Sequence, residues 1–218
     1  MAIGRKKLLE LIENGESNSV EFKRKGTAPE KLSKEICAFA NTKGGFLIIG
    51  VDDDRKLIGV KSEKTEIDLI ETACQFYINP VPSYEIDVIQ LLSVDVVIAH
   101  IPQSMKKPHK VKLFDAERKK TYWRAYIRYG ENSVIASREM TNLMAFLVDD
   151  KPIKNISIGK TEKILFEHLE KNSRTNVKEF SKIANISRRR AERILIQMVR
   201  LGLLIIHNDT KQDYFTMN

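Results

Sequence analysis

The sequence predicts an α+β protein with an N-terminal mixed-sheet α/β domain and a small C-terminal winged helix-turn-helix domain. Three observations predict it. Strand and helix patterns alternate over residues 1–150, the pattern breaks at Asp149-Asp150-Lys151-Pro152, and residues 151–218 show three helices followed by a hairpin. A chain of 218 residues is long enough for one large domain or two small ones. We therefore expect domains at 1–150 and 151–218.

The elements of the N-terminal domain follow from apolar periodicity and from the residues that start and stop helices. An amphipathic helix over residues 8–12 ends at Gly15, a favourable residue just beyond a helix. Pro29 begins a second helix, and the segment 46–51 is apolar on both faces, as expected of a central strand. The remaining expected elements are strands at 20–23, 57–60, 84–89, 94–101, 111–114 and 122–128, a helix at 67–77, and a helix at 138–147 capped by Ser137.

Caps and apolar spacing define the C-terminal domain. Helical spacing begins after Thr161, Asn176 with Glu179 predicts the start of a second helix, and Ser187 caps a third. The segments 203–206 and 214–216 flank a polar turn and predict a hairpin. Three helices followed by a hairpin is the order of a winged helix-turn-helix.

Positive charge is concentrated in the C-terminal domain. The chain has a net charge of +8. Residues 151–218 hold 14 Lys+Arg against 7 Asp+Glu, a net of +7, whereas residues 1–150 hold 23 against 22, a net of +1. A small domain with this excess has a field suited to a polyanion such as nucleic acid. A solvated basic surface is the alternative.

Several classes of protein are excluded by what the sequence lacks. No apolar run reaches the roughly 18 residues that a membrane span needs, and the first residues lack the apolar core of a signal peptide. We expect a cytoplasmic protein with no membrane partner, in which Cys37 and Cys74 are reduced core thiols. The histidines lack metal-ligand spacing. Gly159-Lys160-Thr161 is not the end of a P-loop, because Lys154 stands where the earlier glycine would be.

The third helix of the C-terminal domain is the candidate for DNA recognition. In helix-turn-helix proteins this helix enters the major groove with its N-terminal residues nearest the bases. Arginine suits the position because its planar fork matches both phosphates and guanine edges. The candidate contacts are Arg188, Arg189, Arg190 and Arg193, with Lys178, Lys182 and Lys211 for the DNA backbone.

The layout of this domain favours duplex DNA over RNA as the partner. Duplex half-sites would also reward a homodimer, although no coiled-coil pattern enforces one. The alternative is a protein-interaction or dimerisation module with a solvated basic face.

Five stretches of the N-terminal domain resemble the Schlafen AlbA-like domain family. They are ESNSVEFKRK (16–25), AFANTKGGFLIIGVDDD (38–54), LIGV (57–60), KKPHKV (106–111) and AYIRYGENSVIAS (125–137). They occur in the family's order and cover most of residues 14–147. The resemblance implies nucleic-acid binding, for which no cofactor is required. Bacterial members often carry a C-terminal winged helix as well, and many are described as DNA-binding transcriptional regulators.

A subset of this family consists of metal-dependent nucleases that act on structured RNA through three acidic side chains. The resemblance places their counterparts at Glu16, Glu21 and Asp53, and clustered carboxylates can hold Mg²⁺ or Mn²⁺ beside a scissile phosphate. Glu16 and Glu21 are five residues apart, so one straight strand would point them to opposite faces. They converge only if Glu16 lies on a turn before the strand, which Asn14-Gly15 makes feasible.

Each of these three residues has a purely structural alternative. Asp53, like Asp52 beside it, could form a hairpin tip, where aspartate is favoured. Glu21 could pair across strands with a lysine, and Glu16 could cap a loop. The third ligand could also be Asp52 instead of Asp53, because the turn length can differ.

Other basic residues of the N-terminal domain could contact nucleic acid. They are Lys23, Arg24 and Lys25 after the first strand, and Lys107 with its neighbours Lys106, His109 and Lys110 in a long polar loop. Tyr122, Arg124, Tyr126 and Arg128 alternate along one expected strand, so we expect all four on one face, where aromatic and cationic groups suit stacking and phosphate contact. The alternative is a mixed surface with the tyrosines packed under a helix.

These patterns together predict a nucleic-acid-binding protein, with a DNA-binding transcriptional regulator as the favoured function. A divalent-metal-dependent endonuclease acting on RNA is the alternative, so whether the chain is an enzyme stays open. A module that binds only protein partners is a third hypothesis.

Overall fold

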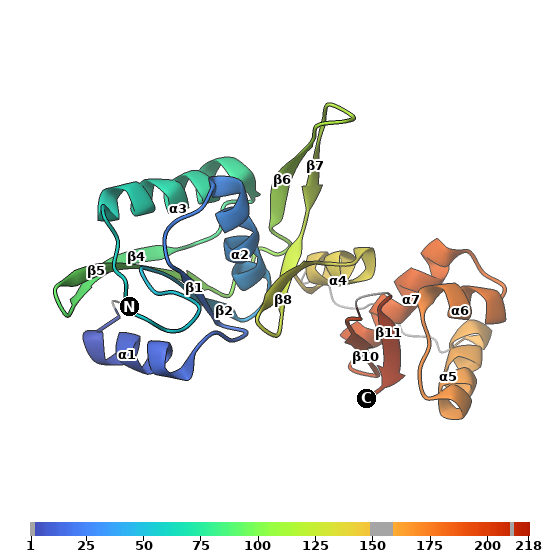
Figure 1. Cartoon of the computed structure of the whole chain (residues 1–218). Coiled ribbons are helices and arrows are strands. Elements are labelled where there is room, and N and C mark those ends of the chain that lie inside the picture. The colour runs from blue at the N-terminus through green and yellow to red at the C-terminus, as the bar shows by residue number, and fades with distance from the viewer. Residues whose placement is uncertain (1–2, 149–158, 210–211) are drawn as a thin grey trace. The chain divides into compact units, whose positions relative to one another are not determined.

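The computed structural model describes residues 3–148, 159–209 and 212–218. The chain divides into two compact units between Ala136 and Ser137 (Figure 1). The boundary expected between residues 150 and 151 lies outside the described residues. Helix α4 (Arg138–Val148) therefore belongs to the second unit, where Asn142 donates a hydrogen bond to Glu192.

A four-stranded mixed sheet forms the centre of the first unit. Its order is β1 (Val20–Lys23), β2 (Gly44–Ile49), β5 (Val94–Pro102) and β4 (Glu85–Leu91). β1 and β2 are parallel and are connected through helix α2 (Pro29–Asn41), whereas the other pairs are antiparallel. The mixed sheet and the central position of β2 match the sequence prediction.

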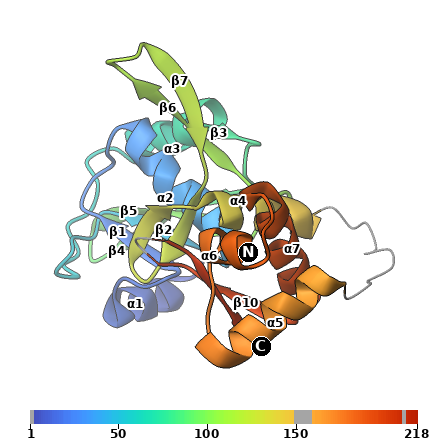
Figure 2. The same cartoon turned by 90° about the vertical axis from the view of Figure 1, so that its right-hand side faces the viewer.

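Helices cover both faces of this sheet (Figures 1 and 2). α2 and α3 (Glu63–Tyr77) pack on one face, and α1 (Arg5–Asn14) packs on the other. Leu47 and Ile49 belong to the core beneath α2 and α3, whereas Ile48 belongs to the core that includes Leu8 of α1. Side chains of a strand alternate between faces, so β2 supplies both cores at once.

The Gly44-Gly45 turn lets α2 and the start of β2 approach closely. Gly44 has φ +78°, in the left-handed region that favours glycine. A Cβ on Gly45 would lie 2.4 Å from Cδ1 of Phe39 and 2.7 Å from the carbonyl oxygen of Ser19. Both glycines are therefore needed at this turn.

Two smaller sheets complete the first unit. One consists of β3 (Ile78–Asn79), β6 (Lys110–Asp115) and β7 (Lys120–Arg124), and its β6–β7 hairpin extends away from the rest of the unit (Figures 1 and 2). The other is a hairpin of β8 (Tyr126–Tyr129) and β9 (Asn132–Ile135), which packs beside α2.

The single strand expected at 122–128 was wrong. The chain breaks at Ala125 into β7 and β8, which belong to different sheets. At the break, the carbonyl of Ala125 accepts a hydrogen bond from the backbone of Ala136. Alternate residues therefore do not share a face: Tyr122 and Arg124 are exposed, whereas Tyr126 and Arg128 are buried.

The strand expected at 57–60 was also wrong. Only Leu57 makes a single bridge, to Val51. The backbone N–H groups of Ile58 and Gly59 both donate to the carbonyl of Gly50, each at 2.8 Å, so they turn back on the preceding segment instead of continuing a ladder.

The second unit contains the three helices and the hairpin that the sequence predicts. The helices are α5 (Lys160–Asn172), α6 (Val177–Ile183) and α7 (Arg188–Arg200), and the strands are β10 (Leu204–His207) and β11 (Tyr214–Met217). The predicted caps are confirmed, because the side chains of Asn176 and Ser187 accept hydrogen bonds from the third residue beyond each. Phe180, Leu195 and Phe215 form the centre of the core.

Two further expectations concern membrane spans and the cysteines. No helix among the described residues is both long enough and apolar enough to cross a membrane. Cys37 and Cys74 are buried free thiols, as predicted, and burial raises the pKa of each to about 12.

Candidate functional site

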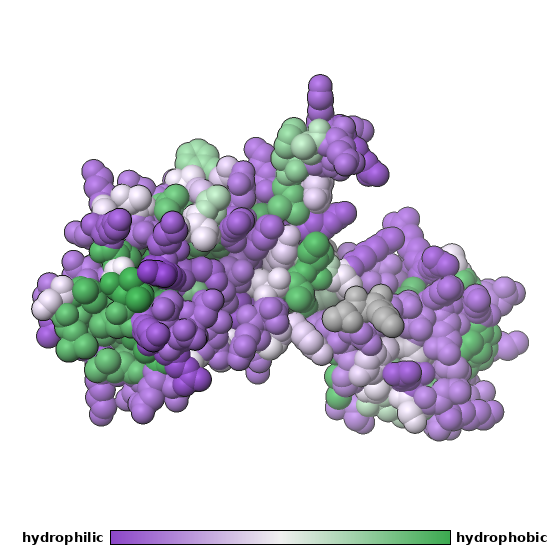
Figure 3. Space-filling model, in the orientation of Figure 1, coloured by the Kyte–Doolittle hydropathy of each residue, from purple (hydrophilic) through white to green (hydrophobic). Residues whose placement is uncertain are grey.

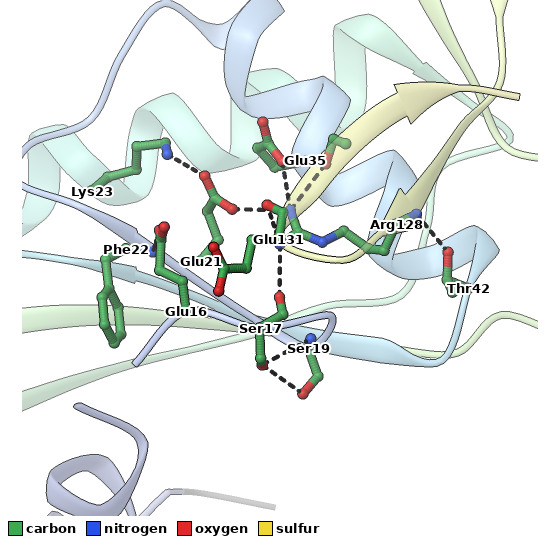
Figure 4. Close-up of polar contacts among 11 residues, drawn as sticks. Glu16, Ser17, Ser19, Glu21, Phe22, Lys23, Glu35, Thr42, Arg128 and Glu131 are labelled. Atoms are coloured by element: carbon green, nitrogen blue, oxygen red, sulfur yellow. Dashed lines mark hydrogen bonds and ion pairs between the residues drawn. The ribbon is translucent and has the colours of Figure 1, made fainter. Parts of the chain in front are cut away.

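A buried arginine, Arg128 of β8, lies between two acidic side chains in the first unit (Figure 4). Its Nη1 donates to Oε2 of Glu21 at 2.9 Å and to Oε2 of Glu35 at 3.0 Å. The hydroxyl group of Ser133 in β9 donates a hydrogen bond to Oε2 of Glu35 and accepts one from the same Nη1 at 3.1 Å. The Arg128 side chain is 0% exposed. Its charge is therefore used inside the protein and is not presented to a ligand.

Arg128 also holds backbone segments that are distant in sequence. Its Nη2 donates to the carbonyl oxygens of Ser17 and Glu131, each at 2.8 Å, and its backbone N–H donates to Oγ1 of Thr42 at 3.0 Å. The guanidinium carbon lies 4.8 Å from the ring centroid of Phe39. The loop before β1, the C-terminal part of α2 and the β8–β9 hairpin thus meet at one side chain.

This network joins three of the stretches that carry the family resemblance. Glu21 lies in 16–25, Thr42 in 38–54 and Arg128 in 125–137. The sequence reasoning missed Glu35, because nothing in its spacing on a polar helix face marks it. It also placed Arg128 on one strand face with Tyr122, Arg124 and Tyr126, which the break at Ala125 rules out.

Glu16 lies on a bend between α1 and β1, as its convergence with Glu21 requires. α1 ends at Asn14 and is capped by Gly15, which has φ +84°, and a tight turn closes with the Ser17–Val20 bridge. The Glu16 side chain then lies back along β1 and accepts a hydrogen bond from the backbone of Phe22 at 2.8 Å (Figure 4).

The pKa of Glu16 reveals its acidic surroundings. Burial is the largest cause that raises this pKa, the hydrogen bond from Phe22 opposes the rise, and the charges of Glu21 and Asp53 add to it. Glu21 and Asp53 are therefore the two acidic residues whose charges act on Glu16. Asp52 is used in the turn, where its Oδ1 accepts from the backbones of Asp54 and Lys56, whereas Asp53 is exposed.

The carboxylates as arranged do not fit a metal ion. Oε2 of Glu21 accepts from Arg128 and its Oε1 from Lys23, so two cations already neutralise it. Oε1 of Glu16 is bonded to Phe22. Over residues 3–148, 159–209 and 212–218, no group of three or more His, Cys, Asp or Glu residues is placed to hold a metal ion.

We expect Asp53→Asn to lower the pKa of Glu16, because it removes a negative charge that disfavours ionisation. A raised carboxyl pKa means that the folded state binds the proton more tightly, so Glu16 opposes folding increasingly as the pH rises above its ordinary value of 4.5. NMR titration of the glutamate side-chain carboxyl carbons measures the shift. Asp54→Asn is the control and should leave Glu16 unchanged. Equal pKa values in the two variants would contradict the proximity of Asp53.

The arginines predicted to read DNA form an exposed face at the N-terminal end of α7. They are Arg188, Arg189, Arg190 and Arg193. A hollow of about 660 Å³ lies beside three of them and is also lined by Arg138 and Asn142 of α4. Glu192, on the same helix, is buried and pairs with Arg138 at 3.5 Å. The face that remains exposed at this end is therefore basic.

The other predicted contacts of the second unit lie on α6. Lys178 and Lys182 are exposed and line a separate hollow of about 670 Å³, together with Arg174 and residues of the β10–β11 hairpin. Lys211 lies outside the described residues.

The basic candidates of the first unit fall into two groups. Arg24 and Lys25 are exposed and line a hollow of about 650 Å³ together with Lys61, and Arg124 is also exposed. The others are engaged within the fold: Lys23 pairs with Glu21, Arg128 is buried, and Nζ of Lys107 donates to the carbonyl of Thr42 at 2.9 Å. Burial also lowers the pKa of Lys107.

Comparison with known proteins gives a family match over the first unit. A family model described as Schlafen, AlbA_2 matches residues 16–137. The chain is similar to the DIP2311 protein from Corynebacterium diphtheriae, with 23% identity over 56% of this chain and a TM-score of 0.39, and it covers 25% of that protein's chain. It is also similar to the N-terminal domain of a protein described as related to the ATP-dependent DNA helicase RecG, from Nitrosomonas europaea. That match has 23% identity and a TM-score of 0.41, and covers 63% of this chain and 91% of the other.

Proposed function

The chain belongs to the Schlafen AlbA_2 family, and from that premise we propose that it is a cytoplasmic nucleic-acid-binding protein that acts as a DNA-binding transcriptional regulator. The observation that carries this proposal is the exposed arginine face at the start of α7. Residues 151–218 hold 14 Lys+Arg against 7 Asp+Glu, so the same part of the chain has the field that attracts a polyanion.

We assign the second unit as a winged helix-turn-helix. In this assignment α6 and α7 form the helix-turn-helix, α7 is the recognition helix, and the β10–β11 hairpin is the wing. A bridge between Thr175 and Phe215 supports it, because this bridge ties the wing to the loop before α6. The Ser187 cap starts α7 immediately before its arginines, so they occupy the first turns, where a recognition helix meets base edges.

A metal-dependent nuclease is the second candidate function. It is favoured by one observation: Glu16 lies within electrostatic range of both Glu21 and Asp53. It is opposed by the pairing of Glu21 with Arg128 and Lys23, because these two cations already neutralise that carboxylate. We therefore rank binding without cleavage first.

One incubation series tests both candidates. The full chain is mixed with labelled duplex DNA, single-stranded DNA and tRNA, each with Mn²⁺, Mg²⁺ or EDTA, and resolved on native and denaturing gels. We expect duplex DNA to shift, the shift to weaken steeply with salt because phosphate contacts release counterions, and no strand to be cut.

Two variants identify the source of any cleavage. Asp53 and Asp54 are adjacent and both exposed, so Asp53→Asn and Asp54→Asn should fold alike. Metal-dependent cutting that Asp53→Asn abolishes and Asp54→Asn retains would establish the nuclease instead. The absence of any salt-sensitive shift would point to a module that binds protein partners.

A further inference from the structure

The β6–β7 hairpin exposes three aromatic side chains to solvent. Phe114 is 68% exposed, Trp123 40% and Tyr122 38%. The hairpin extends from the first unit, and its surface combines apolar and hydrophilic residues (Figure 3). Exposed aromatic groups contribute little to folding, so their gathering on one projecting element suggests a binding surface.

The strand register places two of these aromatic groups on one face. Phe114 pairs with Thr121, and Lys112 pairs with Trp123. Directly opposed residues share a face, as do alternate residues of a strand, so Phe114, Trp123 and Lys112 point to the same side. Phe114 and Trp123 are diagonal neighbours, roughly 7–8 Å apart by the usual sheet spacing. Neighbouring bases of an unstacked single strand can match that separation.

The opposite face anchors the hairpin and carries the third aromatic group. Val111 is fully buried in the core beneath α2 and α3, and Leu113 packs against the same core. Directly opposite Val111 and Leu113 are Arg124 and Tyr122, and the guanidinium carbon of Arg124 lies 5.2 Å from the ring centroid of Tyr122. One face of the hairpin is therefore held by the fold at its base, while the face that carries Phe114 and Trp123 is exposed.

The positive charge of the first unit lies on this hairpin. Residues 110–124 hold 6 Lys+Arg against 2 Asp+Glu, a net of +4. Residues 1–136 hold 22 against 19, a net of +3, so the first unit without the hairpin has a net of −1. A polyanion would thus be attracted to the hairpin in preference to the rest of the unit.

We propose that the β6–β7 hairpin binds single-stranded nucleic acid. Phe114 and Trp123 stack on unpaired bases, and the lysines and arginines beside them contact phosphates. Paired bases offer no free face to such a platform, so the hairpin discriminates against duplex. This site is separate from the arginines of α7, and the proposal does not depend on the function assigned to that helix.

Trp123 is the single tryptophan of the chain, so its fluorescence reports directly on the proposed site. The experiment uses the full chain carrying Arg188→Ala, Arg189→Ala and Arg193→Ala, which removes the other proposed DNA contacts. This protein is titrated with oligodeoxythymidine, with oligouridine and with a duplex of the same length. We expect saturable quenching by the single strands, with affinity about 10-fold or more above that for the duplex. The two single-strand arms show whether DNA or RNA is preferred.

A matched pair of variants separates stacking from general exposure of aromatic groups. Phe76 of α3 is 69% exposed, almost the same as Phe114, so Phe114→Leu and Phe76→Leu remove equivalent rings from the same unit. We expect Phe114→Leu to weaken single-strand binding about 10-fold and Phe76→Leu to leave it unchanged. No quenching, equal quenching by duplex, or equal affinities of the two variants would overturn the proposal. So would self-association that Phe114→Leu abolishes without any effect of oligonucleotide, because it would make the hairpin a protein contact.

Discussion

Replacing Arg188, Arg189 and Arg193 together with alanine is expected to weaken duplex DNA binding about 100-fold or more. Each well-placed arginine contact with a base edge is worth roughly 1–3 kcal/mol, and each lost phosphate contact lowers the salt slope by about 0.9. The three side chains are exposed and alanine is a good helix former, so α7 should stay folded. Fluorescence anisotropy of a labelled duplex over a series of salt concentrations measures both quantities.

The control for this variant removes the same charge from another helix of the second unit. Lys160, Lys163 and Lys171 are exposed on α5, so replacing them with alanine lowers the net charge by the same three units. We expect this control to weaken binding by no more than a few-fold, because α5 is not the recognition helix of the proposed fold. Equal losses of affinity in the two triple variants would mean that duplex binding depends only on the overall positive charge of the protein. The assignment of α7 as the recognition helix would then fail.

Replacing Arg128 with methionine is expected to destabilise the first unit by about 3–5 kcal/mol. The substitution keeps a long apolar side chain beside Phe39 but leaves the carboxylates of Glu21 and Glu35 without their shared cation. It also removes the hydrogen bonds to Ser17 and Glu131. Arg128→Lys should not retain the stability of the parent, because a single ammonium group cannot reproduce the planar guanidinium that bonds to all these groups. Urea unfolding followed by Trp123 emission measures the change, since Trp123 lies in the same unit.

The loss in Arg128→Met should shrink at acidic pH. Burial already raises the pKa of Glu35 in the native protein, while Arg128 opposes that rise. Without Arg128 the pKa of Glu35 rises further. The negative charge of Glu35 then opposes folding at pH values above its ordinary pKa of 4.5, and protonation removes that charge at lower pH. Unfolding at pH about 4 and about 7 therefore gives the smaller difference from the parent at the lower pH.

Two further variants isolate the ion pairs. Arg124→Met removes an exposed arginine four residues away and should change stability by less than about 0.5 kcal/mol. Adding Glu35→Gln to Arg128→Met removes one carboxylate charge that has lost its cationic partner, and it should recover part of the lost free energy of unfolding. If Arg128→Met were as stable as Arg124→Met, the network would contribute no stability.

Local patterns in the sequence determined the type and limits of most elements. Apolar runs mark β2 as central, Asn176 and Ser187 mark the starts of α6 and α7, and the arginines at the start of α7 are evident from the sequence alone. These features depend on neighbours within a few residues, since a cap bonds three residues ahead and a helical face repeats within one or two turns. The sequence alone therefore sufficed for them, and the turn that brings Glu16 toward Glu21 was also foreseeable from Gly15.

The tertiary structure alone decided which polar side chains are buried. The alternation over 122–128 is the same whether the segment is one strand or two, and only the separate partners of β7 and β8 place Tyr122 in solvent and Arg128 in the interior. Glu21 and Arg128 are 107 positions apart, so no local signal links them. Glu21, one of the acidic residues that suggest a metal site in the sequence, is the counter-ion of a buried and a half-buried cation. Burial and ion pairing depend on contacts between distant segments, which the periodicity of a single segment does not contain.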